Sequence, residues 1–267
     1  MRNGILIVKI SALSLTLIGC AVLAVVFGMY GFHQTRTDSV IQDFKQTVEQ
    51  LQTDGSDEPT PTDSSKATNT EDTNSAKYAE SADAHEVEAP LLHTKVDVEA
   101  LRRDSLQYNE SLKQNQNLLL TGKNYAYAAL ELTRYGIDNN LYGYVSAPSI
   151  GLELPIYLGA NDETMSLGAG HLCYTSLPTG GESTNAVLAG HTGYIGRWLF
   201  DSVTNLNVGD SVDVNTYFGK LHYTVTKIFD KAPNDSGMIF IEKGKDKLTL
   251  ITCIHGGTAR RVVVCER

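Results

Sequence analysis

The feature that most constrains the fold of this chain is an uncharged apolar run near its N-terminus. Residues 10–30 read ISALSLTLIGCAVLAVVFGMY and contain no Asp, Glu, Lys or Arg. As an α-helix with a rise of about 1.5 Å per residue, such a run spans the hydrocarbon core of a bilayer, which is about 30 Å thick. The sequence therefore predicts a transmembrane helix within an anchor formed by residues 1–32.

The charges around this run predict its orientation. Arg2 and Lys9 flank its N-terminal side, and its C-terminal side continues toward a long acidic segment. Because Lys and Arg are enriched on the cytoplasmic side of membrane helices, we expect the N-terminus in the cytoplasm and the rest of the chain outside. The letters LIGC at residues 17–20 also resemble the cleavage site of lipoprotein signal peptides. The chain stays apolar as far as residue 30, however, which favours an uncleaved anchor.

A strongly acidic segment follows the anchor. Residues 53–90 hold ten acidic side chains and two lysines, so they carry −8 of the net charge of −9. Such a polar segment buries too little apolar surface to offset the loss of chain entropy on folding, which predicts that it is disordered. We place the predicted extracellular spacer, which includes this segment, at residues 33–90. The remaining body is nearly neutral and has no basic patch, which argues against a nucleic-acid partner.

The folded domain is predicted over residues 91–267. Residues 95–120 have the apolar spacing of an amphipathic helix or two, and residues 125–136 continue this helical pattern as far as Gly136. Short β-branched and aromatic runs separated by turn signals follow: LYGYVSAPSI, LELPIYLG, NAVLAGH, DSVDVNTY, KLHYTVTKIFD, KLTLITC and RRVVVCER. Seven or eight such strands predict a mainly β domain, in which helices pack on a closed antiparallel barrel or a sandwich.

Three of the four cysteines, Cys173, Cys253 and Cys265, lie outside the predicted membrane helix. Because three is an odd number, at least one thiol stays free or pairs with another molecule. Cys253 ends the run KLTLIT, and His191 ends the run NAVLAG. A thiolate, an imidazole and a positive group that steadies an oxyanion are the parts of a cysteine nucleophile site. A cysteine at a strand end is also often a packed small apolar residue.

Three histidines compete for the role of acid or base. His171 lies in a Gly- and Pro-containing loop, His191 ends a strand, and His255 follows Cys253 by two residues. Residue chemistry alone ranks them equally. The pairs His171 with Cys173 and Cys253 with His255 also leave a zinc site open, although one intervening residue within each pair is unusual for structural zinc.

Several motifs resemble the sortases in order and spacing, most closely the class C group that polymerises pilins. They are GYVSAPSIGLELPIYLG, GAGHLCYTSLPTGGE, NAVLAGHTGYIGRWLFDSVTNLNVGD, KLTLITC and RRVVV, with YNESL at residues 108–112 resembling the helix that precedes the barrel. The resemblance covers residues 105–266 and implies an eight-stranded β-barrel. It implies that Cys253 is the nucleophile, His191 the catalytic histidine and Arg261 the catalytic arginine. Arg260 is the runner-up, because the loop after Cys253 is about one residue shorter than usual.

The resemblance also implies a function. A sortase is a cysteine transpeptidase that cleaves an LPXTG-type sorting signal between Thr and Gly and joins the acyl group to an amine, without a cofactor or metal. The amine is a pilin lysine in the class C group and a cell-wall precursor peptide in housekeeping enzymes. A non-catalytic, membrane-tethered barrel that binds a surface protein is the competing class.

Class C enzymes usually carry a lid with an Asp-Pro-aromatic motif upstream of the barrel. Residues 113–140 contain no Asp-Pro. We therefore expect that the upstream segment does not plug the site at Cys253.

Overall fold

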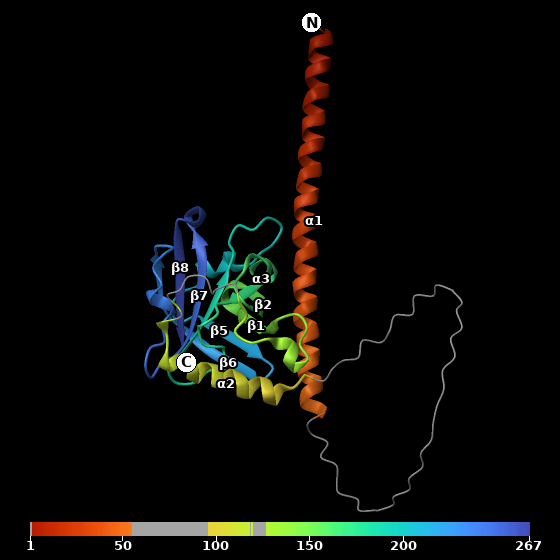
Figure 1. Cartoon of the computed structure of the whole chain (residues 1–267). Helices are drawn as coiled ribbons and strands as arrows, with labels where there is room; N and C mark the ends of the chain where they lie inside the picture. The colour runs from red at the N-terminus through yellow and green to blue at the C-terminus, as the bar shows by residue number, and fades with distance from the viewer. Residues whose placement is uncertain (1, 55–95, 118, 120–126) are drawn as a thin grey trace, which may run out of the picture.

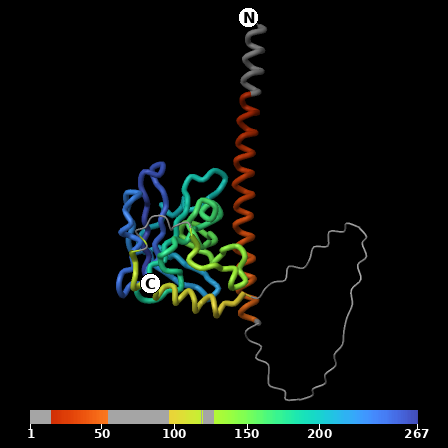
Figure 2. The backbone as a smooth tube through the Cα atoms, in the orientation of Figure 1, coloured from red at the N-terminus to blue at the C-terminus, as the bar shows by residue number. Residues whose placement is uncertain are grey.

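The computed structural model describes residues 2–54, 96–117, 119 and 127–267, with the backbone alone for residues 2–14. Its longest element is α1 (Arg2–Asp54), a helix that stands beside a β-barrel and extends well beyond it toward the N-terminus (Figures 1 and 2). Within the described residues, α1 is the one helix long and apolar enough to cross a membrane. The predicted anchor thus coincides with a candidate membrane span.

Eight strands of the described part of the chain close into a barrel (Figure 1). They are β1 (Leu141–Ala147), β2 (Leu152–Leu158), β3 (Ala169–His171), β4 (Thr184–Gly190), β5 (Ser211–Thr216), β6 (Gly219–Lys231), β7 (Asp246–Ile254) and β8 (Ala259–Glu266). Their order around the barrel is β1-β2-β3-β4-β7-β8-β6-β5. Short helices occupy the connections, namely η3 (Pro148–Ile150), α3 (Asp162–Leu167), η4 (Phe200–Asn205), η5 (Gly237–Ile239) and η6 (His255–Gly257). The predicted closed eight-stranded barrel is confirmed.

The strand directions differ in part from the prediction. Six of the eight pairings between the described strands are antiparallel, but β2 pairs with β3 and β4 pairs with β7 in parallel. An all-antiparallel barrel was therefore the wrong expectation. β4 and β7 are far apart in the sequence, so no local turn signal indicates that they pair.

The side chains of β7 and β8 alternate between the barrel interior and its outer face, as the pleat of a strand requires. Leu248, Leu250 and Val263 belong to the interior core. Ile251 instead packs outside, in a second apolar cluster that includes Val187 of β4. These two faces separate the residues of the candidate site.

The lower part of α1 packs against the barrel. Ile41 and Phe44 are buried, and the Phe44 ring lies 4.8 Å from that of Tyr217. The Lys45 ammonium also meets the Glu153 carboxylate of β2 at 2.6 Å. The sequence placed residues 33–90 in a spacer, whereas residues 33–54 continue α1; residues 55–95 lie outside the described residues.

The helix α2 (Val98–Gln114) crosses one end of the barrel (Figure 1). Asp97 begins it, because its carboxylate accepts a hydrogen bond from the Ala100 N–H. Among the described residues 127–136, the predicted helical pattern holds only for η2 (Leu132–Tyr135), since residues 127–131 form bends and irregular backbone. Gly136 ends that helix with φ 78°, a conformation that favours glycine.

Candidate active site

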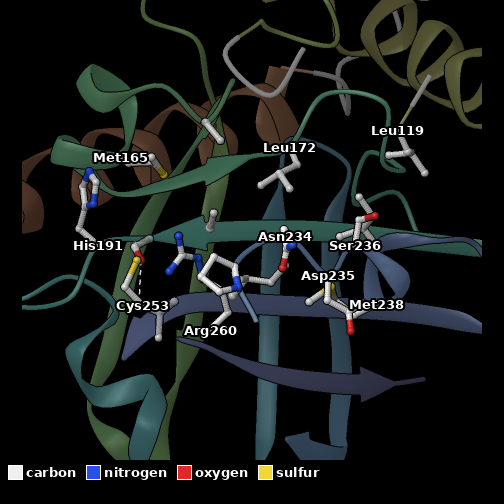
Figure 3. A pocket seen from close by; sticks show the side chains of 17 residues that line it. Leu119, Met165, Leu172, His191, Asn234, Asp235, Ser236, Met238, Cys253 and Arg260 are labelled. Atoms are coloured by element: carbon white, nitrogen blue, oxygen red, sulfur yellow. Dashed lines mark hydrogen bonds between the residues drawn. The ribbon is translucent and has the colours of Figure 1, made fainter. Parts of the chain in front are cut away.

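A groove of about 530 Å³ lies over the outer face of β4 and β7 (Figure 3). Its apolar lining comes from Leu119, Ala160, Met165, Leu172, Ala189, Met238, Ile239 and Ile251. Asn234, Asp235 and Ser236 add polar groups from the connection between β6 and β7. His191, Cys253 and Arg260 gather at the opposite end of the groove from Leu119 and Met238 (Figure 3). The groove thus joins an apolar channel to a cluster of reactive side chains.

Strand register brings His191 to Cys253. β4 and β7 run in parallel with Gly190 opposite Thr252, so the next residue of each strand continues the pairing with His191 level with Cys253. The hydroxyl of Thr192 donates to the Cys253 carbonyl at 2.6 Å and ties the two strand ends together. The sequence prediction that these two residues share a site is consistent with this placement.

Close packing also explains the glycine before His191. A Cβ on Gly190 would lie 2.5 Å from the Phe200 ring, which is too close for any larger residue without a shift. The Phe200 N–H donates to the His191 carbonyl at 2.9 Å, and the His191 ring stacks on Tyr194 with centroids 5.5 Å apart. The segment after β4 therefore positions His191 in two ways, through a hydrogen bond to its backbone carbonyl and through a ring stacked on one face of its imidazole.

Arg260, and not Arg261, reaches the groove. Arg260 lies directly opposite Cys253 in the β7–β8 ladder, so their side chains share the outer face. Its guanidinium donates to the carbonyl of Gly257 at 3.0 Å, in the turn that follows Cys253. Arg261 faces the other side, where it pairs with Asp230 at 2.5 Å and donates to the Thr204 carbonyl at 3.3 Å. The structure thus does not bring the predicted catalytic arginine to the cysteine.

The other two histidines lie outside the groove lining. His171 ends β3 and is fully buried, and burial lowers its pKa to about 4. Its Nε2 lies 2.9 Å from the Ser176 carbonyl, as expected for a neutral structural imidazole. The prediction that His171 lies in a loop was wrong, because a strand of three residues shows no alternation. His255 starts the exposed turn η6.

The zinc alternative finds no support in this arrangement. Among the residues that the structure describes, no three His, Cys, Asp or Glu side chains lie close enough to hold a metal ion. His171 belongs to the buried interior, whereas Cys253 lines the groove.

A family model described as Sortase domain matches residues 145–267. Sortase A of Bacillus anthracis is 30% identical over 125 residues, which are 46% of this chain and 58% of that protein. The chain spans between 50% and 58% of the length of the curated relatives it matches.

Solved structures cover more of the fold. Sortase C1 of Streptococcus agalactiae, in complex with MTSET, is 31% identical with a TM-score of 0.55 and coverage of 65% of this chain and 91% of that chain. Sortase C of Clostridium perfringens, with the C-terminal cell wall sorting motif, is 32% identical with a TM-score of 0.51 and coverage of 63% and 89%. The chain belongs to the sortase family.

The cysteines of this sortase differ in environment. The structure describes all four, and none forms a disulfide. Cys265 is buried in the barrel core, and this burial raises the pKa of its thiol to about 12. Burial likewise raises the pKa of Cys173. Cys253 is half-buried and lines the groove, so among the three cysteines of the domain it is the one placed to meet a substrate.

The segment upstream of the barrel reaches the groove of this sortase, which the absence of an Asp-Pro motif did not predict. Leu119 is buried with Leu172, Val187 and Ile239. The side chain of Gln116 accepts a hydrogen bond from the Ile241 N–H at 2.7 Å. Leu119 lies at the end of the groove away from Cys253 (Figure 3). The prediction of an open approach covered residues 113–140, of which residues 118 and 120–126 lie outside the described residues.

The polar groups of residues 234–236 were also missed. They lie in the connection that follows β6, and Asp235 is fixed by Lys231 at 2.7 Å and by the Gly237 N–H at 3.0 Å. The letters PNDSG at residues 233–237 form a turn signal, which marks a loop but does not show that the loop borders a groove.

Proposed function

We propose that this protein is a membrane-anchored cysteine transpeptidase. The observation that carries the proposal is the convergence of His191, Cys253 and Arg260, from β4, β7 and β8, at one end of an apolar groove. The three groups supply the nucleophile, the proton donor and the positive charge that acyl transfer through a thioester requires.

In the first half-reaction, the Cys253 thiolate attacks the carbonyl carbon of the scissile peptide bond. The electron pair of the carbonyl moves to oxygen, and the guanidinium of Arg260 stabilises the resulting oxyanion. The carbon–nitrogen bond then breaks as the His191 imidazolium gives its proton to the departing amine. The acyl group remains on Cys253 as a thioester.

In the second half-reaction, an amine attacks the thioester carbonyl. His191 accepts the proton from the attacking nitrogen, and the sulfur leaves as a thiolate. A new amide forms, and the enzyme returns to its starting state. The role that the sequence assigned to Arg261 passes to Arg260 in this mechanism, because Arg260 shares the face of Cys253 and Arg261 is engaged by Asp230.

The substrate in this proposal is an LPXTG-type sorting signal, cleaved between Thr and Gly. The apolar lining of the groove suits the Leu and Pro side chains of such a peptide in an extended form. The C. perfringens sortase C relative, solved with a cell wall sorting motif, supports this choice.

A pilin lysine is the amine acceptor we favour. The structural relatives include class C sortases, and two of them are described as belonging to a pilus island. A cell-wall precursor peptide is the alternative, since the curated relatives include proteins named Sortase A. α1 would anchor the enzyme with its N-terminus in the cytoplasm and the barrel outside the cell.

The test is to trap the thioester. The full chain is reconstituted in lipid nanodiscs and incubated with an LPXTG peptide in the absence of an acceptor. Intact-mass spectrometry should find the N-terminal peptide fragment bound to Cys253, and hydroxylamine should release it. A lysine-bearing pilin peptide and a cell-wall stem peptide, supplied separately, then identify the acceptor. A chain that never gains the acyl mass would be a non-catalytic binding module, and the proposal would fail.

A further inference from the structure

The upper part of α1 is uncovered above the level at which it meets the barrel domain. Large apolar side chains are exposed from Leu15 to Phe32, with Met29 40% exposed. Contact with the barrel domain begins at Met29 and Tyr30, the last residues of the uncharged run. The barrel therefore lies at the level where the apolar part of the helix ends.

The part of the domain that meets this level is the loop of residues 193–198, between β4 and η4. The Trp198 ring lies against the Tyr30 ring, with centroids 5.2 Å apart and an interplanar angle of 33°. At Gly196, which has φ 83°, a Cβ would lie 3.2 Å from the Met29 side chain. The loop thus packs on α1 through two neighbouring residues of the helix.

Large apolar side chains of this loop are nevertheless exposed. Ile195 is 74% exposed, Trp198 is 63% exposed, and Tyr194 is also exposed. Such a cluster is unusual on a water-facing loop, but Trp and Tyr are enriched where membrane proteins cross the headgroup layer.

Positive side chains accompany the aromatic rings. Arg197 lies over the Tyr194 ring at 5.9 Å, and Arg36 of α1 lines the same small cavity as Arg197 and His33. Burial lowers the pKa of His33, and the charges of the Arg197 and Arg36 guanidinium groups lower it further. Cations beside an apolar tip complement an anionic headgroup layer.

We propose that the loop of residues 193–198 inserts into the outer headgroup layer of the bilayer that α1 crosses. The occupant of this exposed apolar surface is the lipid, because Trp198 of the loop packs on Tyr30 at the end of the apolar run of α1, whose own large apolar side chains are exposed. The inference rests on the proposed membrane insertion of α1 but not on the catalytic activity.

The insertion fixes the active-site end of the barrel toward the membrane. The loop begins two residues after His191, and Asp201 closes its base by accepting from the Gly193 N–H at 2.7 Å and the Leu199 N–H at 3.1 Å. In Figure 1 the tip where β7 and β8 meet lies at the same end of the barrel as the exposed part of α1. Cys253 and Arg260 are next to that tip. A substrate held in the same bilayer would therefore reach the groove from the membrane side.

Tryptophan fluorescence can test this directly, because Trp198 is the only tryptophan in the chain. The full chain is placed in vesicles of phosphatidylcholine and phosphatidylglycerol, with a fraction of the lipid carrying a nitroxide near the headgroup. We expect blue-shifted emission, loss of most of it to the nitroxide lipid, and little quenching by iodide in the buffer.

The matched control moves the tryptophan to the far end of the barrel. Val208 is 65% exposed, and the neighbouring Gly209 N–H bonds to Val225, which pairs with Cys265 at the end of β8 away from Arg260. In Val208→Trp with Trp198→Phe, iodide should quench the emission and the lipid should not.

Vesicle flotation separates the two possible failures. A chain that does not float with the vesicles shows that α1 is not inserted, which removes the basis of the inference while leaving the thioester test intact. A chain that floats, but in which Trp198 responds to both quenchers as the control does, overturns the insertion of the loop itself.

Discussion

The two faces of the β7–β8 ladder carry the same pair of residue types in opposite settings. On the outer face, Cys253 stands opposite Arg260 and both line the groove. On the inner face, Arg261 is the next residue of β8 after Arg260, Cys265 lies four residues further along the same strand, and neither lines the groove. Burial raises the pKa of the Cys265 thiol to about 12, and Asp230 pairs with Arg261.

The difference shows that the environment of a cysteine or an arginine in this ladder depends on which face of the strand the side chain occupies, and not on residue type alone. A thiol in the core stays protonated at neutral pH because its thiolate would be poorly solvated. An arginine already paired with a carboxylate has less of its charge available for an oxyanion. Substitutions on each face of the ladder can test this contrast.

The cysteines should give the largest contrast. Cys253→Ala removes the atom that forms the thioester, so transpeptidation of an LPXTG peptide should fall below detection in the nanodisc assay. Cys265→Ala leaves the Cys253 sulfur in place and should retain most of the turnover. Wild-type-like turnover in Cys253→Ala would show that the nucleophile lies elsewhere.

The histidines should give the next largest contrast. Loss of an acid or base typically costs a factor of about 10² to 10⁴ in rate, so His191→Ala should lower kcat/KM by roughly that amount. His255→Ala is the matched control, since His255 is exposed in the turn after Cys253, and it should lower kcat/KM much less. His171→Ala should also cost less turnover, although it opens a cavity in the core. Equal losses in His191→Ala and His255→Ala would contradict the assignment.

The adjacent arginines test the two faces most directly. Removing one oxyanion donor costs about 10² to 10³ in kcat, so Arg260→Ala should fall by that factor. Arg261→Ala should stay within several-fold of the wild type, because its partners are Asp230 and Thr204. A larger loss of kcat in Arg261→Ala than in Arg260→Ala would identify Arg261 as the catalytic arginine, as the sequence resemblance implies.

The sequence indicated the cysteine and histidine that line the groove more easily than the arginine that lines it. Cys253 and His191 each end an apolar run, and motif spacing locates a strand end directly. Successive side chains of a strand point to opposite faces, so choosing between Arg260 and Arg261 requires the exact register of β8 after a short turn. An error of one residue in that register places the wrong arginine on the face of Cys253. That turn contains three consecutive residues with positive φ, namely His255, Gly256 and Gly257.

The fold was predictable to a similar extent. β-branched runs indicate most of the strands, but β3 has only three residues, which is too short for such a run. The parallel pairing of β4 with β7 depends on contacts between residues that are far apart in the sequence. The continuation of α1 was missed although a signal exists: Val40, Phe44, Val48 and Leu51 recur at helical spacing within a polar segment. Overall polarity outweighed that periodicity in the prediction of a spacer.

The smallest expected effect concerns the ion pair of the inner face. The hydrogen bond and charge of Arg261 lower the pKa of the Asp230 carboxyl below its usual value. A carboxyl whose pKa is lower in the folded state stabilises the fold above its unfolded pKa, about 4, and this contribution disappears as the pH falls through the folded pKa. Because the Asp230 side chain is 43% exposed, solvent screening limits the contribution to about 0.2–1 kcal/mol.

Asp230→Asn removes the charge and keeps the shape, so it should lower the Tm of the full chain in nanodiscs slightly at pH 7, as measured by circular dichroism. The difference from the wild type should shrink in high salt and vanish once the pH is well below the usual range of a carboxyl. Transpeptidation should be almost unchanged, since the pair lies on the face away from Cys253. A Tm difference that persists in acid would mean that Asp230 acts through packing, and a large loss of turnover would mean that the two faces of the ladder are coupled.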